Sequence, residues 1–180
     1  MDNAEKTIMD STAMDRTMSR LAHEIIEHNE DISNICLIGI LRRGVAIANV
    51  LTDKIEKFCG IRPLSGKLDI SLYRDDLTSL SEQPIVNGTE IGFDVKGKTV
   101  ILVDDVIYTG RTSRAAMDAV MKLGRPAKIQ LAVLVDRGHR ELPIRGDYIG
   151  KNIPTSLDER ILVKFPEFDG TTAVTIRNDK

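Results

Sequence analysis

The residues best suited to chemistry lie together in the stretch Val100–Thr112. Four apolar residues are followed by two carboxylates, Asp104 and Asp105, and then by a turn that contains Gly110. In open α/β sheets, ligands bind beyond the carboxyl ends of the strands, so we expect both carboxylates to be exposed there. The turn leads into a helix, whose free N–H groups and dipole favour a phosphate. The pattern predicts a site for a ribose 5-phosphate, in which the carboxylates accept hydrogen bonds from sugar hydroxyls or hold magnesium through water.

Other phosphate-binding motifs do not fit this stretch. The lysine that follows glycine in a P-loop is absent after Gly110, and the chain has no G-x-G-x-x-G fingerprint. A strand, an acidic turn and a helix cap without any ligand would explain an isolated pair of aspartates. The pattern as a whole, from Val100 to Thr112, favours a ligand site.

Hydrophobic periodicity predicts the elements that position this stretch. Helices are expected at Ser11–Asn29, capped by Asp10 or Ser11, and at Val45–Phe58 and Thr112–Leu123, and strands at Ile35–Ile40, Lys67–Tyr73, Thr99–Val103 and Ile129–Val135. Strands that alternate with helices imply an α/β fold with parallel pairing. The tail adds two short strands, Ile161–Lys164 and Ala173–Ile176. The segment Arg74–Asp94 has no clear periodicity, which is typical of a loop that closes over a site.

The composition limits the class of protein. A chain of 180 residues suits one domain, 1–180. The formal net charge of −2 disfavours a protein that depends on non-specific nucleic-acid binding, so any such binding needs a local basic patch. No apolar run is long enough to cross a bilayer and no signal peptide precedes the first helix, so we expect a cytoplasmic protein without membrane contact. Cys36 and Cys59 lack zinc-ligand or redox spacing.

The stretch Val100–Thr112 resembles the motif of type I phosphoribosyltransferases that binds 5-phosphoribosyl-1-pyrophosphate (PRPP). Further stretches resemble the PyrR family, bacterial regulators of pyrimidine operon attenuation that are also uracil phosphoribosyltransferases. These stretches are Ser19–Glu24, Ser71–Leu77, Val135–Arg145 and Asp147–Thr155. The resemblance extends from about Ser11 to Thr155. It implies a single domain with a mostly parallel central sheet flanked by helices, a small hood around residues 135–155 and a flexible loop over residues 74–94.

The resemblance also assigns roles to individual residues. The catalytic residues would be Asp104, Asp105 and Arg42, with Asp104 and Asp105 near Mg²⁺ that arrives with PRPP. PRPP or UMP would contact Leu41, Arg42, Arg43, Val106, Ile107, Tyr108, Thr109, Gly110, Arg111 and Thr112. In the family, the loop that matches Leu41–Gly44 binds the diphosphate and often contains a cis non-proline peptide. Val135 and Arg137 would lie at the base. Read alone, however, Arg42 and Arg43 are equally well two solvated arginines, and Arg137 could lie on the surface.

The implied reaction converts uracil and PRPP to UMP and diphosphate. The family also binds the leader mRNA of pyrimidine genes when UMP or UTP is bound, and it forms dimers or larger homo-oligomers. RNA contacts would come from Ser19, Arg20, His23, Arg140, Arg145 and Lys151, with Arg140 on the outer side of the hood. Two alternatives stay open: a pyrimidine salvage enzyme without RNA regulation, and a nucleotide-sensing regulator without catalysis. A purine enzyme is disfavoured, because purine-using relatives carry an Asp where this chain has Tyr108.

Overall fold

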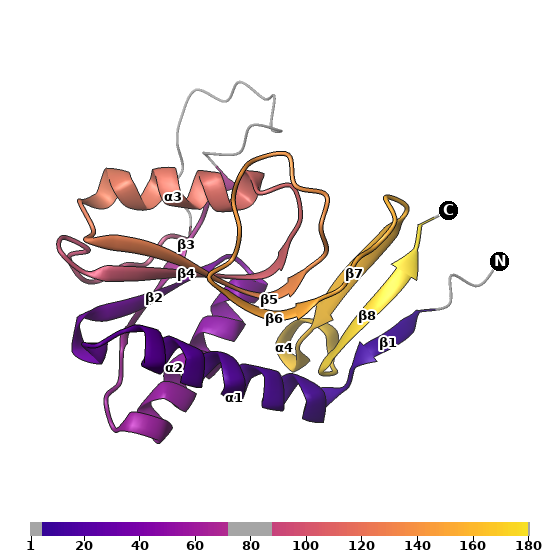
Figure 1. The fold of residues 1–180 in the computed structure, drawn as a ribbon, viewed down its shortest axis with the longest axis horizontal. Coiled ribbons are helices and arrows are strands. Elements are labelled where there is room, and N and C mark those ends of the chain that lie inside the picture. Colours follow the sequence, from indigo (N-terminus) through magenta and orange to yellow (C-terminus); the bar gives the residue numbers. More distant parts are fainter. Residues whose placement is uncertain (1–4, 72–87, 180) are drawn as a thin grey trace.

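A computed structural model describes residues 5–71 and 88–179 (Figure 1). The helices are α1 (Ser11–His28), α2 (Arg43–Cys59), α3 (Arg111–Leu123) and the short α4 (Pro166–Asp169), with a 3-10 turn at Ile32–Asn34. The strands are β1 (Lys6–Met9), β2 (Ile35–Ile40), β3 (Leu64–Leu68), β4 (Thr99–Ile107), β5 (Lys128–Asp136), β6 (Tyr148–Asn152), β7 (Glu159–Lys164) and β8 (Ala173–Asn178). No helix within these residues is long and apolar enough to cross a membrane.

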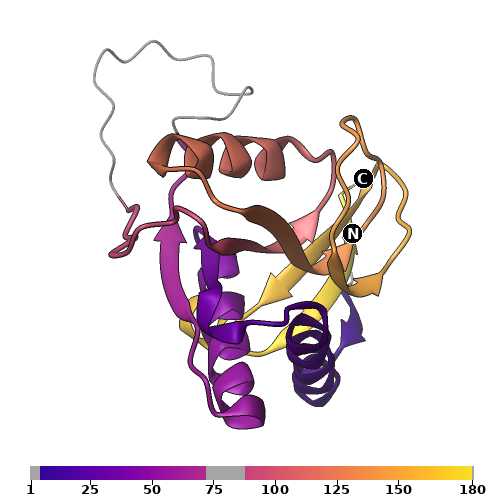
Figure 2. The same cartoon turned by 60° about the vertical axis from the view of Figure 1, so that its left-hand side comes forward.

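Five strands form the central sheet, in the order β3-β2-β4-β5-β6, and every neighbouring pair is parallel. Helices α1 and α2 cover one face and α3 covers the other (Figures 1 and 2). Two buried apolar clusters fill the spaces between these layers, one on each face of the sheet. The predicted α/β fold with a parallel central sheet flanked by helices is therefore confirmed.

A second sheet has three antiparallel strands in the order β1-β8-β7. Its strands β7 and β8 extend the two strands predicted for the tail, whereas β1 was not predicted. The sheet joins the core on the α1 side through Met9, Val163 and Val174. Segments from the two ends of the chain, 170 residues apart in sequence, are thus paired, with Lys6 opposite Ile176. The segment expected to form a hood, residues 135–155, holds the end of β5, an irregular loop and β6.

The first helix follows its sequence pattern closely. Its buried residues include Met14, Met18, Leu21 and Ile25, which recur at helical spacing. Of the two candidate caps, Asp10 closes the helix start, because its carboxylate accepts a hydrogen bond from the Ala13 N–H at 2.8 Å.

The strand predicted at Lys67–Tyr73 is misplaced. The observed strand β3 ends at Leu68, because β2, the strand beside it in the described sheet, ends at the paired residue Ile40. Burial still alternates through Leu68 and Ile70, which explains why the pattern looked like a continuing strand. Most of the loop predicted at 74–94 lies outside the described residues. Its described end contains Glu90, which forms an antiparallel bridge with Lys67.

Candidate active site

A pocket of about 480 Å³ opens at the carboxyl ends of β2 and β4. It brings together the two acids, the start of α3 and the loop after β2, as the sequence predicted. The lining residues are Ile40, Leu41, Arg42, Asp69, Ile70, Ser71, Asp104, Asp105, Val106 and Thr112. Asp69, Ile70 and Ser71 were not predicted at the site, because the sequence pattern placed them in the middle of a strand. Their position after a strand that ends at this edge of the sheet was the available signal.

The loop Leu41–Gly44 lies against the main sheet. The peptide between Leu41 and Arg42 is cis, as the family resemblance implied. The Leu41 N–H donates to the carbonyl of Leu68 at 3.0 Å. Gly44 contacts β4 so closely that a Cβ there would overlap the carbonyl oxygen of Val103. These contacts hold the exposed Arg42 at the pocket.

The two acids differ in environment. Strand β4 continues past the end of β2 while it still pairs with β5 through Ile107, so Asp104 and Asp105 lie on extended strand rather than in a turn. The prediction that both are exposed is wrong for Asp104, which is only 8% exposed. Burial raises the pKa of the Asp104 carboxyl well above its usual range, and the neighbouring Asp105 raises it further. Asp105 is half-buried and is the more accessible acid.

The turn before α3 is held through its carbonyl groups. The Tyr108 carbonyl accepts from the Arg140 guanidinium at 2.8 Å. The Thr109 carbonyl accepts from the N–H groups of Glu141 and Leu142 at 2.9 and 3.1 Å. Gly110 adopts a left-handed conformation, with φ of 92°, and no side chain caps the helix that follows. The Arg111 N–H donates to the Thr109 hydroxyl at 3.3 Å, which leaves the following N–H groups of the first turn, those of Thr112 and Ser113, available for an anion at the pocket.

Several predicted contact residues direct their side chains elsewhere. The Arg43 guanidinium bonds the Val163 carbonyl and Asp169, so the expectation that two arginines face the diphosphate is wrong for Arg43. Arg111 pairs with Glu141 at 2.7 Å. The side chains of Ile107 and Val135 are buried in the two apolar clusters, so neither can contact a ligand through its side chain. The Val135 side chain is buried because β5 runs to the following residue, Asp136.

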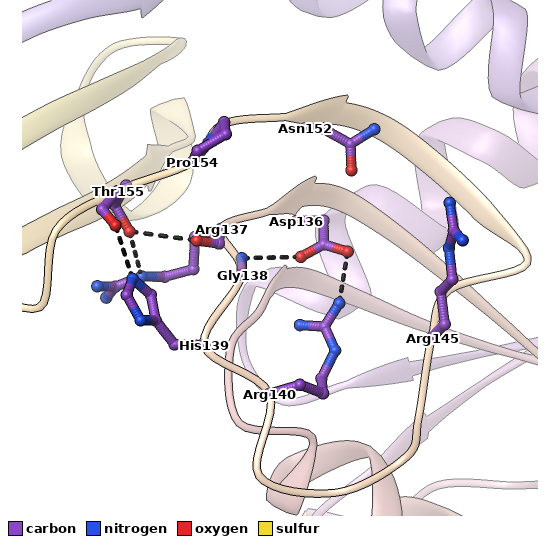
Figure 3. A pocket seen from close by; sticks show the side chains of 9 residues that line it. All are labelled: Asp136, Arg137, Gly138, His139, Arg140, Arg145, Asn152, Pro154 and Thr155. Carbon is purple, nitrogen blue, oxygen red and sulfur yellow. Dashed lines mark hydrogen bonds and ion pairs between the residues drawn. The ribbon is translucent and has the colours of Figure 1, made fainter.

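A second pocket, of about 550 Å³, lies beyond the ends of β5 and β6 (Figure 3). Its lining residues are Asp136, Arg137, Gly138, His139, Arg140, Arg145, Asn152, Pro154 and Thr155. Arg137 is 8% exposed rather than a surface residue. Its guanidinium donates to the Thr155 hydroxyl at 3.1 Å and lies 4.1 Å from the centre of the Tyr108 ring. Arg137 thus links this pocket to the turn before α3.

Arg140 does not lie on the outer side of the loop, which corrects the sequence prediction. Figure 3 shows its guanidinium turned toward the Asp136 carboxylate, with which it forms an ion pair. Both side chains are largely buried, at 23% and 10% exposure. Because Arg140 also bonds the Tyr108 carbonyl, it supports the predicted phosphate loop.

The other residues predicted to contact RNA occupy α1, β6 and the loop before β6. The Arg20 guanidinium pairs with Glu24 and also bonds the carbonyl of Gly150, next to Lys151. His23 stacks on Phe58, with ring centres 4.1 Å apart. Ser19 accepts a hydrogen bond from Lys54 at 3.0 Å. Arg145 and Lys151 are exposed. The structure thus brings α1 and β6 to one surface, with Arg145 at the margin of the second pocket.

Comparison with known proteins identifies the family. A sequence model of the phosphoribosyl transferase domain matches residues 5–165. The bifunctional protein PyrR of Clostridium acetobutylicum is 58% identical, over 97% of this chain and 98% of its own. The bifunctional protein PyrR of Halalkalibacterium halodurans is 57% identical, over 95% of this chain and 96% of its own. A hypoxanthine phosphoribosyltransferase of Trypanosoma cruzi covers 100% of both chains with a TM-score of 0.74 at 17% identity, and so shares the fold. The chain therefore belongs to the PyrR family of phosphoribosyl transferase domain proteins.

Proposed function

We propose that this protein is a uracil phosphoribosyltransferase that also regulates pyrimidine genes by binding their leader mRNA in response to uridine nucleotides. The identity of 55–58% to PyrR proteins over nearly the full chain is the observation that carries this proposal. The geometry at the ends of β2 and β4 supports the catalytic half. We further propose a cytoplasmic location, where PRPP and mRNA are found, and assembly into dimers or larger oligomers.

The residues around the first pocket suit the parts of PRPP. The N–H groups at the start of α3, with the hydroxyls of Thr109 and Thr112, would hold the 5-phosphate. Asp105, and the buried Asp104 behind it, would accept hydrogen bonds from the ribose hydroxyls. Arg42 would neutralise the leaving diphosphate. The base nitrogen attacks C1 of the ribose as the C1–O bond to diphosphate breaks, so catalysis rests mainly on positioning and on stabilising the leaving group.

Magnesium would enter with the diphosphate. Among the described residues, no three metal-ligating side chains come close enough together to form a metal site. The carboxylates of Asp104, Asp105 and Asp69 do line the pocket, and oxygen ligands are those that magnesium prefers. This donor set fits an ion that is held mainly by diphosphate oxygens and contacts the protein through water. When bound, the ion would supply positive charge to the leaving group.

The side chains near the turn before α3 favour a pyrimidine base. Tyr108 stands where purine-using relatives carry an Asp, so the contact to purine N7 is missing. Arg137 packs on the Tyr108 ring and is fixed by Thr155 and by the Ser156 carbonyl at 3.2 Å. Tyr108 and Arg137 are our candidates for the side chains that limit the size of the base.

For the regulatory half, we propose that leader RNA binds the surface formed by α1 and β6. Arg20, His23, Arg145 and Lys151 are exposed, and the net charge of −2 requires such a local patch. RNA loops are recognised through splayed bases, stacking and phosphate contacts, which these side chain types can provide.

Two assays separate this proposal from the alternatives. Titration of leader RNA with and without UMP should show tight binding only when UMP is present, and binding should weaken as salt rises. UMP formation from uracil and PRPP should be measured beside it. Catalysis without RNA binding would indicate a salvage enzyme, and RNA binding without catalysis would indicate a nucleotide sensor. Either result would overturn the bifunctional proposal.

A further inference from the structure

Arg43 links the loop Leu41–Gly44, which contains the cis peptide and is called the cis loop below, to the second sheet. It is the first residue of α2 and follows the Leu41–Arg42 peptide. Its Nε donates to the carbonyl of Val163 on β7 at 2.7 Å. Its Nη2 donates to both carboxylate oxygens of Asp169, at 2.9 and 3.2 Å. The guanidinium carbon also lies 5.5 Å from the centre of the Phe168 ring. One side chain therefore makes contacts with two separate elements of the tail.

Contacts that do not involve Arg43 also hold Asp169 in position. Asp169 ends α4, the four-residue helix that connects β7 to β8. Its Oδ2 accepts from the N–H of Phe165 at 3.0 Å, and Phe165 is itself only 5% exposed. The Phe165 N–H holds the pKa of the Asp169 carboxyl below its usual value, and Arg43 lowers that pKa further. The Asp169 carboxylate is thus held in position by the backbone of the buried Phe165.

Among the described contacts, the main sheet holds the cis loop at its two ends. Leu41 is held by the Leu68 carbonyl, and Gly44 is held against Val103. Arg42 lies between these points and is exposed at the pocket. Among the described residues, its guanidinium has no ion pair of its own. The direction of the Arg42 side chain therefore depends on the adjacent backbone, which the hydrogen bonds of Arg43 connect to the second sheet.

We propose that Asp169 and Arg43 are positioning residues that set the direction of Arg42 for the diphosphate. This inference rests on the proposed phosphoribosyl transfer. It gives the second sheet a part in the reaction, because that sheet supplies both Val163 and the α4 connection. A small displacement of a positioned cation costs substantial binding and catalysis. An exposed ion pair with no such role would contribute little to either.

The test compares Asp169→Asn and Arg43→Lys with the matched control Asp179→Asn. Asp179 also pairs with an arginine of the second sheet, Arg177, at 2.7 Å, and it does not contact the cis loop. For each variant we would measure kcat, KM for PRPP, KM for uracil, and calorimetric binding of magnesium diphosphate. Thermal unfolding would be measured in parallel.

We expect Asp169→Asn and Arg43→Lys each to raise KM for PRPP and Kd for magnesium diphosphate by about three- to tenfold, the range that corresponds to the net contribution of one ordinary hydrogen bond. KM for uracil should stay within about twofold, and Asp179→Asn should resemble the wild type. Because both residues act through one contact, the double variant should be no worse than the worse single variant.

Unchanged PRPP and diphosphate binding in both single variants, even with a lower melting temperature, would overturn the inference and leave the pair a structural contact. Failure of the proposed function looks different. The wild type would then not convert uracil and PRPP, while calorimetry with magnesium diphosphate would still report on the positioning of Arg42.

Discussion

Asp104→Asn should stabilise the protein while it damages the reaction. Asp104 is 8% exposed and adjoins Asp105, and both factors raise the pKa of its carboxyl in the folded chain. As pH rises above the ordinary value of 3.8, the unfolded chain loses this proton first, so the free energy of unfolding falls. A neutral amide removes that penalty. It also keeps an oxygen that can accept from the Asp105 N–H, which Asp104 now bonds at 2.9 Å.

The gain should be about 1 kcal/mol at pH 8, typical of relieving a strained functional residue. For a chain of this size it corresponds to about 2–4 °C in melting temperature. The gain should shrink as pH falls through the raised pKa of the folded state toward 3.8, and it should vanish well below 3.8, where the carboxyl is protonated in both states. Loss of a charged acceptor for a ribose hydroxyl costs about 1.5–3 kcal/mol, or about 10- to 150-fold in kcat/KM for PRPP.

The assay is thermal unfolding of both proteins from pH 5 to pH 8, beside UMP formation. Asp53→Asn is the matched control, because Asp53 is 67% exposed on α2 and should change stability by less than about 0.5 kcal/mol. A variant that is less stable than the wild type at pH 8 would refute the reasoning, since it would mean that the buried carboxylate is favourably solvated by the protein.

Close backbone packing, a buried ion pair and the burial of a thiol each have a measurable consequence. Gly44→Ala should lower stability by about 1–3 kcal/mol, because the new methyl overlaps a β4 carbonyl, whereas Gly92→Ala, with open space around it, should be nearly neutral in the same unfolding assay. Arg140→Ala should lower UMP formation at least about tenfold, by loss of a charged hydrogen bond to the phosphate loop, and an unchanged rate would show that the loop holds without it. In thiol titration at pH 8, Cys59 should react in the native protein. Cys36 should react only after unfolding, because burial raises its pKa to about 11; two fast thiols would contradict this assignment.

The sequence predicted the elements whose burial is uniform. The strands β2, β4 and β5 each contain an apolar run that is covered on both faces of the sheet. The edge strands were harder to recognise. Strand β1 is short and mostly exposed, and β6 contains glycine and polar residues, so neither carries a clear period. The end of β3 depends on its partner rather than on its own pattern.

The candidate site was predicted at the level of backbone segments. The start of α3, the acids and the cis loop meet at one pocket, because they lie at or beyond the carboxyl ends of β2 and β4, at the same edge of the sheet. The directions of long side chains could not be predicted in this way. Arg43 bonds Asp169, 126 residues away in sequence. Arg140 turns inward to Asp136, although its place beside the predicted hood suggested an outer position. Such contacts depend on tertiary packing, which no local pattern records.

The most direct test of the central claim is the rate of diphosphate release from PRPP by the wild-type protein with different bases. With magnesium present, uracil should produce sustained release that matches UMP formation mole for mole. Hypoxanthine should give no more release than the reaction without a base, because the aspartate that purine enzymes carry is replaced by Tyr108. Release that hypoxanthine supports as well as uracil, or no release with uracil, would contradict the account.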